Sequence, residues 1–287
     1  MTRLLVTGST GQLGRELVAV ARAAGIEVAG LARTEPEPCD LTDAAAVQRR
    51  ITGWAPDLVI HAGAATDVDA CERKPGLAQR TNVEGTRHVV DAARAVGAHV
   101  VLLSTNHVFG EGSPRPHREQ DPTTPRSAYA RTKVEAEQLV GPDATIVRTS
   151  WLWGSGGRSL VRTVIEAASR PGPLAFADDE RARPTLARDL APVVVRLGTE
   201  RRAGTWHAAN SGDLSAYEVA REVLRACGDD PDRAVPVPIA QLGLDRPAPR
   251  PRNAILDTTH LERDGGGGLP HHGPGLAALV AELLGEA

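Results

Sequence analysis

Tyr129 and Lys133 stand four residues apart in the stretch SAYARTK, residues 127–133. One helical turn separates them, so both side chains leave the same face of a predicted helix. A tyrosine hydroxyl can give its proton to a carbonyl oxygen, and a nearby ammonium lowers the phenol pKa from its free value of about 10. The same spacing also occurs on ordinary helices, where the tyrosine packs and the lysine solubilises. Other motifs of the sequence are needed to distinguish these interpretations.

A third polar group that could join this pair is the hydroxyl at the end of the stretch LLST, residues 102–105. The stretch AHVVLLS, residues 98–104, reads as a buried strand, and groups at the carboxyl ends of parallel strands face the ligand crevice. We expect Thr105 to bind the carbonyl oxygen, with Ser104 as the alternative. Lys133 could also hold the ribose hydroxyls of a nicotinamide cofactor.

Composition excludes several classes of protein. The 287 residues carry a net charge of −3 and no basic run, so nucleic acid is not an expected partner. No apolar stretch has spanning length, and the start MTRLLVTG does not resemble a signal peptide. The three scattered cysteines fit neither a metal site nor a disulfide framework, which favours a cytoplasmic location. The many Ala, Arg, Gly and Pro residues indicate a coding bias, so the arginines receive no functional weight.

The first half of the chain alternates between apolar runs and helical patterns. This alternation predicts an α/β fold, a Rossmann-type doubly wound parallel sheet covered by helices on both faces. The predicted strands are 3–7, 26–31, 57–63, 98–104 and 145–150. The predicted helices are 12–24, 43–51, 80–96 and 127–140.

The second half of the chain is less regular and is dense in proline beyond residue 228. Residues 187–199 and 214–227 read as helices, the latter with Ser211 and Asp213 as candidate caps, and 204–209 reads as a strand. We therefore expect a dinucleotide-binding domain over 1–150, to which 187–227 return. Residues 151–186 and 228–287 should form mainly a small, mixed C-terminal substrate lobe.

A glycine-rich turn follows the first predicted strand and opens the first predicted helix. In VTGSTGQLG, residues 6–14, the glycines Gly8, Gly11 and Gly14 have the spacing G-x-x-G-x-x-G. Glycines allow backbone N–H groups to approach a pyrophosphate at a helix N-terminus, where the helix dipole favours an anion. The pattern alone is weak, but the strand before it and the helix after it make a dinucleotide site the favoured interpretation.

Arg33 indicates which nicotinamide cofactor binds. It stands near the end of the second strand, where an NAD site has an acid for the ribose 2′-hydroxyl. A guanidinium suits a 2′-phosphate, so we expect NADPH. The alternative is a solvated Arg33 with Glu35 serving the ribose. Asp40, which we place after a short third strand, is a candidate partner of the adenine ring.

These motifs together resemble the extended short-chain dehydrogenase/reductases, and more narrowly the dTDP-4-dehydrorhamnose reductase family of dTDP-4-keto-6-deoxyhexose reductases. The matching stretches run in order over nearly the whole chain: VTGSTGQLG, PDLVIHAGAATDVDACE, NVEGT, STNHVF, YARTK, VRTSWLWG, RPTLARDLA, GTWHAANSGDLSAYEVARE and RPAPRPRNAILDTTHL. The pattern RTSW followed by PTLARDLA separates this family from sugar-nucleotide epimerases and dehydratases better than the glycines do.

The resemblance implies roles for individual residues. The catalytic residues would be Thr105, Tyr129 and Lys133, and Arg148 would brace the strand or the cofactor. Trp151 and Val68 would contact the sugar, although Trp151 could instead be a core tryptophan, a role open to Trp153 as well. The cofactor would be bound by Gly8, Thr10, Gly11, Gln12, Leu13, Arg33, Asp40, Leu41, Ala62, Ala64, Thr66, Tyr129 and Lys133.

One departure from the family lies beside the sugar pocket. The family usually reads Ser-Thr-Asp-Tyr-Val-Phe, and this chain has Asn106 and His107 in place of the Asp and Tyr. We expect His107 to contact a sugar hydroxyl directly or through water, and to carry a proton near neutral pH. The alternative is that His107 turns away and packs under the lobe.

The leading interpretation is an enzyme that reduces C4 of a dTDP-4-keto-6-deoxyhexose with NADPH in deoxysugar biosynthesis. An alternative of another class is a non-catalytic NADP-binding protein, similar to the regulatory subunit of methionine adenosyltransferase. An epimerase that retains its cofactor is a third. The sequence predicts no metal site, and it leaves open the sugar, the C4 stereochemistry and the oligomeric state, with a homodimer as one option.

Overall fold

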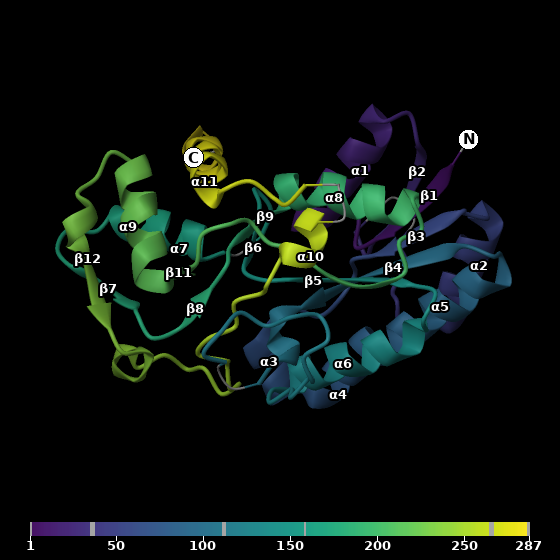
Figure 1. Ribbon diagram of the computed structural model, residues 1–287, viewed down its shortest axis with the longest axis horizontal. Coiled ribbons are helices and arrows are strands. Elements are labelled where there is room, and N and C mark those ends of the chain that lie inside the picture. The colour runs from purple at the N-terminus through teal and green to yellow at the C-terminus, as the bar shows by residue number, and fades with distance from the viewer. Residues whose placement is uncertain (1, 35–37, 111–112, 158, 264–266, 286–287) are drawn as a thin grey trace.

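A six-stranded parallel sheet forms the centre of the protein (Figure 1). The computed structural model describes residues 2–34, 38–110, 113–157, 159–263 and 267–285. In spatial order the strands are β10 (Gly204–His207), β5 (Thr145–Thr149), β4 (His99–Thr105), β3 (Leu58–His61), β1 (Arg3–Thr7) and β2 (Glu27–Leu31). The chain crosses from one side of the sheet to the other between β1 and β3, and such a switch point is where α/β proteins bind nucleotides.

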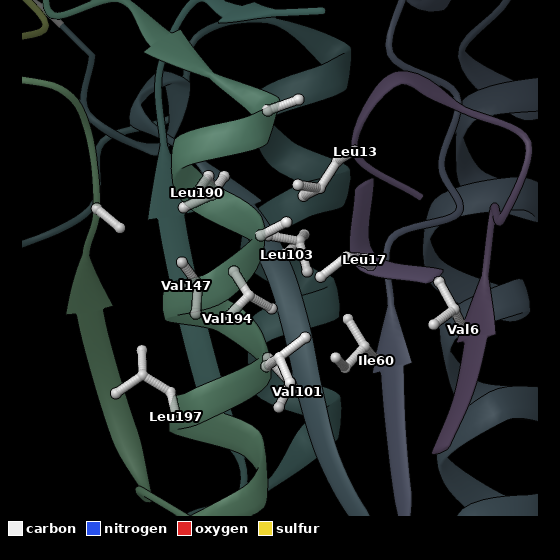
Figure 2. Packing of buried hydrophobic residues seen from close by; sticks show 14 of the residues in the cluster. Val6, Leu13, Leu17, Ile60, Val101, Leu103, Val147, Leu190, Val194 and Leu197 are labelled. Carbon is white, nitrogen blue, oxygen red and sulfur yellow. The ribbon is translucent and has the colours of Figure 1, made fainter. Parts of the chain in front are cut away.

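Helices cover both faces of this sheet, which confirms the predicted doubly wound α/β fold (Figure 1). One face carries α1 (Gln12–Ala23) and α8 (Ala187–Thr199), and the other carries α2 (Ala44–Trp54), α5 (Gly85–Ala95) and α6 (Ala128–Val140). Leu190 and Val194 of α8 pack against Leu17 of α1 and against Val101 and Val147 of the strands (Figure 2). Strands buried on both faces need apolar residues at successive positions, which explains their runs of Val, Ile and Leu.

In the first half of the chain, two predicted elements differ from the structure. The predicted helix over 80–96 is a π-helical segment, η1 (Gln79–Glu84), that runs into α5. The strand expected just before Asp40 is wrong, because residues 38–40 have no strand pairing and β2 forms the edge of the sheet. Cys39 still follows the sheet edge closely, since its N–H donates to the carbonyl of Ala32 at 2.9 Å.

A smaller lobe lies beside the sheet, at the left of Figure 1. Its apolar core gathers Trp153, Phe176, Leu224 and Leu279. The pieces of the lobe are α7 (Leu160–Ala168), α9 (Ala216–Ala226), α11 (His272–Gly285) and the strand pairs β6 (Leu152–Trp153) with β9 (Thr185–Leu186), β7 (Leu174–Ala177) with β12 (Ala234–Val237), and β8 (Arg181–Ala182) with β11 (Leu214–Ser215).

These contacts bear on how the chain divides into domains. Helix α8 packs on one face of the sheet and β10 is its edge strand, whereas α9 contributes Val219, Ala220 and Val223 to the core of the lobe. We therefore propose that the dinucleotide-binding domain takes back residues 187–207 and that the lobe includes α9. The short connecting elements are α3 (Val68–Arg73), α4 (Pro75–Ala78), η2 (Asn106–Val108), η3 (Pro231–Arg233), η4 (Ile239–Leu242) and α10 (Thr259–Leu261). Within the described ranges, every helix is too short or too polar to cross a membrane.

Candidate active site

The glycine turn after β1 is closely packed against the loop that follows β3. Gly8 has a φ of 68°, and its N–H donates to the Leu31 carbonyl at 2.7 Å. A Cβ on Gly8 would lie 2.8 Å from the backbone of Gly63, and one on Gly14 would lie 2.1 Å from the Gly8 carbonyl oxygen. Only glycine fits at either position, so the backbone forms a cradle of the kind that receives a pyrophosphate.

The other residues expected at the phosphates play different parts. Gly11 is the exposed N-cap of α1, and since it has no side chain the first turn of the helix is left uncapped for an anion. The Thr10 hydroxyl accepts a hydrogen bond from Thr34 at 3.2 Å. Leu13 lies in the sheet core with 5% exposure, so only its backbone could serve a cofactor. The amide of Gln12 extends toward Gly157 of the lobe.

Arg33 lies on the adenosine side of this cradle. It is exposed in the turn after β2, and the next residue, Thr34, bonds to Thr10 of the glycine turn. The pKa of Asp40 is lowered by the backbone and hydroxyl hydrogen bonds of Thr42 and by the charge of Arg33. This placement fits a 2′-phosphate beside Arg33, which stays a prediction. The alternative ribose partner, Glu35, lies outside the described residues.

The loop after β3 forms the other wall of the cradle. Ala62 and Ala64 are half-buried, Thr66 is exposed, and the Leu41 side chain closes on Gly63. Asn82 fixes this loop, since its Oδ1 accepts from the Ala65 N–H at 2.7 Å. Its Nδ2 donates to the Ala65 carbonyl at 3.1 Å and to the Thr132 hydroxyl at 3.0 Å. Asn82 was missed as a positioning residue, although it opens the NVEGT motif.

The structure brings Thr105, Tyr129 and Lys133 together as predicted. Their exposed fractions are 6%, 8% and 4%. Tyr129 and Lys133 lie on α6, which is capped by Ser127, and Thr105 ends β4 and hydrogen-bonds with Tyr129. The Lys133 Nζ donates to the Leu103 carbonyl at 2.7 Å. The other candidate hydroxyl, that of Ser104, donates instead to Glu137 at 2.5 Å.

Burial controls the protonation of Tyr129 and Lys133. It raises the pKa of Tyr129 to about 12, and the hydrogen bond with Thr105 opposes that rise. Burial also lowers the pKa of Lys133 to about 8, against the opposing charge of Glu137. The expected lowering of the tyrosine pKa is therefore wrong for this arrangement, because desolvation of the phenolate outweighs the favourable contacts. Tyr129 is protonated at neutral pH, which is the form that a proton donor needs.

The residues predicted to bind a sugar lie close to Tyr129. Val68 of α3 packs in a small apolar cluster with Tyr129. The ring of His107 meets the Tyr129 ring edge-on, with 5.7 Å between centroids. Trp151 is partly buried and has a φ of 38°, while Trp153, with 3% exposure, is the core tryptophan. The Nδ2 of Asn106 donates to the Ala254 carbonyl at 3.0 Å, so this side chain ties the C-terminal segment to β4.

A pocket joins these residues to the lobe and carries three arginines that sequence reasoning missed. Each has a carboxylate partner: Arg250 with Asp69, Arg246 with Glu180 at 3.0 Å, and Arg181 with Glu218 at 2.9 Å. The only sequence signal was the arginine-rich stretch RPAPRPR, residues 246–252, which was set aside as composition bias. The pocket is lined by Asn106, His107, Trp151, Glu180, Arg181, Ala182, Arg246, Arg250, Pro251 and Ala254.

His107 faces this pocket and does not turn away under the lobe. Burial lowers its pKa to about 4, with further lowering by Arg250 and Arg246. The expectation that His107 carries a proton near neutral pH is therefore wrong. Its Nδ1 is buried and has no hydrogen-bond partner among the residues that the structure describes. An unpaired buried nitrogen costs about 1–3 kcal/mol, so a ligand hydroxyl here would find a partner.

Comparison with known proteins finds relatives that are named as dTDP-sugar reductases. The chain is 39% identical to a dTDP-4-dehydrorhamnose reductase of Streptomyces griseus, over 99% of this chain and 95% of that protein. It is also 39% identical to a probable dTDP-4,6-dihydroxy-2-methyloxan-3-one 4-ketoreductase of Streptomyces antibioticus, with 88% and 86% covered.

Solved structures agree with these relatives. The crystal structure of a dTDP-4-dehydrorhamnose reductase from Bacillus anthracis, in complex with NADP, matches with a TM-score of 0.91 and 29% identity. That match covers 98% of this chain and 99% of the other. The family profile described as RmlD substrate binding domain matches residues 1–284. The chain therefore belongs to the RmlD substrate-binding domain family.

Proposed function

We propose that the protein reduces the C4 keto group of a dTDP-4-keto-6-deoxyhexose with NADPH, as a step of deoxysugar biosynthesis. The bound cofactor would supply the hydride. Thr105 would donate a hydrogen bond to the sugar carbonyl oxygen, and Tyr129 Oη would give that oxygen its proton. Lys133 would hold the ribose hydroxyls and stabilise the phenolate that Tyr129 becomes.

The observation that carries this proposal is the assembly of Thr105, Tyr129 and Lys133 at the carboxyl end of β4. Tyr129, with a pKa of about 12, starts protonated, and Thr105 lies beside it. The glycine cradle fits a pyrophosphate because a Cβ on Gly8 or Gly14 would clash with the neighbouring backbone, so only glycines allow this tight turn at the start of α1. Arg33 beside that cradle favours a cofactor with a 2′-phosphate.

The pocket supports a sugar nucleotide as the substrate class. Guanidinium groups bind diphosphate oxygens through paired hydrogen bonds. Arg181, Arg246 and Arg250 line the same pocket as His107 and Trp151, so a diphosphate and a sugar would fit side by side. A cytoplasmic location is part of this proposal, and a homodimer stays open.

The test is NADPH consumption with several dTDP-4-keto-6-deoxyhexoses, using dTDP-glucose as the substrate without a keto group. We expect oxidation of NADPH with at least one keto sugar, release of NADP in each turnover, and no oxidation with dTDP-glucose. Tight NADPH binding without consumption would favour the regulatory-subunit alternative. Interconversion of sugars without net consumption would favour the epimerase.

A further inference from the structure

A buried ion pair lies one helical turn beyond Lys133. Tyr129, Lys133 and Glu137 follow each other at intervals of four on α6, so they form one row. The Glu137 and Arg148 side chains are only 8% and 6% exposed. Arg148 donates from Nε to Glu137 Oε1 at 2.9 Å and from Nη2 to Oε2 at 2.7 Å. This two-point contact fixes the plane of the carboxylate.

Ser104 completes the setting of Glu137. Its hydroxyl donates to Oε1 at 2.5 Å, and it lies opposite Arg148 in the β4–β5 register, directly before Thr105. The remaining Nη1 of Arg148 donates to the Glu119 carbonyl at 3.2 Å. A buried ion pair stabilises a fold little compared with apolar side chains of the same volume. Fold stability alone therefore does not account for this pair.

We infer that Glu137 is a positioning residue: held by Ser104 and Arg148, its carboxylate keeps the buried Lys133 ammonium charged beside Tyr129. The consequence for catalysis rests on the proposed function, but the effect on Lys133 does not.

The groups around Lys133 support this assignment. From β3, His61 is neutral, since burial and the charge of Lys133 lower its pKa to about 3. Tyr129 is protonated, and Arg148 of β5 is paired with Glu137. Glu137 is the charge that raises the pKa of Lys133 against the effect of burial. Without it, an ammonium that is 4% exposed would lose its proton more easily.

The chain offers a direct measurement, because it contains only two lysines, Lys74 and Lys133. Protein labelled with ¹³C-lysine gives two Cε signals, and a Lys74→Arg variant assigns them. We expect the Lys133 signal to titrate near pH 8, as its pKa of about 8 requires. In Glu137→Gln the midpoint should fall by about 1 pH unit, the effect of losing one nearby charge.

Two further variants keep this test decisive. Glu137→Gln leaves Arg148 buried without its partner and could unfold the protein, so a double variant, Glu137→Gln with Arg148→Met, removes both charges. The midpoint should still fall there, but by less than in the single variant, because the positive charge of Arg148 is lost together with the negative charge of Glu137. Glu135→Gln is the matched control, since Glu135 is exposed on the same helix and bonds to Gln79 at 2.9 Å. It should leave the midpoint where it is.

A rate profile connects the titration to catalysis. If catalysis needs a charged Lys133, the alkaline limb of the pH profile of kcat should shift to lower pH by the same amount in Glu137→Gln. The loss would then be about 2-fold at pH 7 and close to ~10-fold above pH 8.5. A Lys133 midpoint within ~0.3 pH units of the wild type in folded Glu137→Gln would overturn the inference, as would no fall in the double variant if only that one folds. If the Lys133 midpoint shifts but the protein has no reductase activity, only the proposed function would be rejected.

Discussion

The cofactor cradle and the substrate pocket are built from different parts of the chain. The cradle is made of backbone, with Gly8, Gly14 and Gly63 in contacts too close for any side chain. The pocket is made of long side chains, with Arg246 and Arg250 held by carboxylates that a diphosphate could replace. Backbone contacts of this kind are fixed before a ligand arrives, whereas ion pairs can exchange partners. We therefore expect substitutions to disable the first region and to retune the second.

The largest effect should come from Tyr129, where the two regions meet. Tyr129→Phe removes the proton donor and keeps the ring, so turnover should fall by at least ~100-fold while NADPH still binds. Steady-state kinetics and cofactor fluorescence measure the two quantities. The chain has one other tyrosine, Tyr217, which bonds to Arg221 in the lobe. Tyr217→Phe should keep its turnover, and a near-normal rate in Tyr129→Phe would remove the reductase assignment.

Arg33 tests the charge at the edge of the cradle. Arg33→Asp should weaken the binding of NADPH by about 10–150-fold, because a hydrogen bond to a charged group contributes about 1.5–3 kcal/mol. NADH, which lacks the 2′-phosphate, should be affected far less. Titrations of both cofactors give the ratio, with Arg225→Asp, an exposed site on α9, as the control. Equal losses for both cofactors would show that Arg33 does not select between them.

Gly14 tests whether the cradle is fixed by sterics. Gly14→Ala would place a Cβ 2.1 Å from the Gly8 carbonyl oxygen, so the free energy of unfolding should fall by about 1–3 kcal/mol. NADPH binding should weaken as well. In Gly53→Ala the new methyl meets open space within α2, so stability should rise by about 0.5–1 kcal/mol. Urea unfolding measures the stability of both variants. An unchanged free energy of unfolding in Gly14→Ala would mean that the turn can rearrange to accommodate the methyl group.

Histidines of the sheet and of the lobe should change the free energy of unfolding with pH in opposite directions. Burial lowers the pKa of His61 and of His207 to about 3, with further lowering by Lys133 and Arg148 respectively. Unfolded histidine titrates at about 6.5, so between pH 6.5 and 3 the unfolded chain binds protons that the native sheet does not. Each of these groups should cost about 1.4 kcal/mol of stability per pH unit as pH falls through that window.

In the lobe His272 behaves in the opposite way. Burial lowers its pKa, but hydrogen bonds with Glu222 and with the Ser211 carbonyl outweigh it and raise the pKa overall. The contribution of His272 to the free energy of unfolding is therefore present below pH ~6.5 and is lost as pH rises through the native pKa. Urea unfolding across pH 5–8 should show a shallower acid slope in His207→Phe and a lost alkaline slope in His272→Gln. Identical profiles in both variants and the wild type would contradict this account.

The smallest effect is expected at His107, in the pocket. His107→Tyr should change the ratio of kcat/KM between two 4-keto sugars that differ at C2, C3 or C5. One hydrogen bond at the pocket wall contributes about 0.5–1.5 kcal/mol, so the ratio should move by about 2- to 12-fold. Since its pKa is about 4, the ratio should not depend on pH between 6 and 8. A uniform change for every sugar would mean that His107 shapes the fold and not the specificity.

The same contrast explains what the sequence could predict. Tyr129, Lys133 and Gly8 belong to local patterns, a helical turn and a strand–turn–helix unit, and these patterns predicted both the sheet and the assembly of the trio. Arg181, Arg246 and Arg250 come together only through tertiary packing, so no local spacing marks them. The short strand expected just before Asp40 was overpredicted, since residues 38–40 have no strand partner and Pro38 has no N–H to donate to one.

Helix caps show the same limit on a smaller scale. Ser211 and Asp213 were expected to cap the helix after residue 213. The actual cap is Ser215, which forms a capping box with Glu218. The S-x-x-E spacing was present in SAYE, residues 215–218, but the short strand β11 that precedes it was read as part of the helix.

The central claim is that hydride reaches C4 of a keto sugar while Tyr129 protonates the oxygen. Incubation of a dTDP-4-keto-6-deoxyhexose with NADPH that carries deuterium at both C4 positions, in wild-type protein and in Tyr129→Phe, tests it most directly. The account predicts one deuterium at C4 of the sugar for each NADP released by the wild type, and at least ~100-fold slower transfer in the variant. A reduced sugar without deuterium at C4, or equal transfer in both proteins, would contradict it.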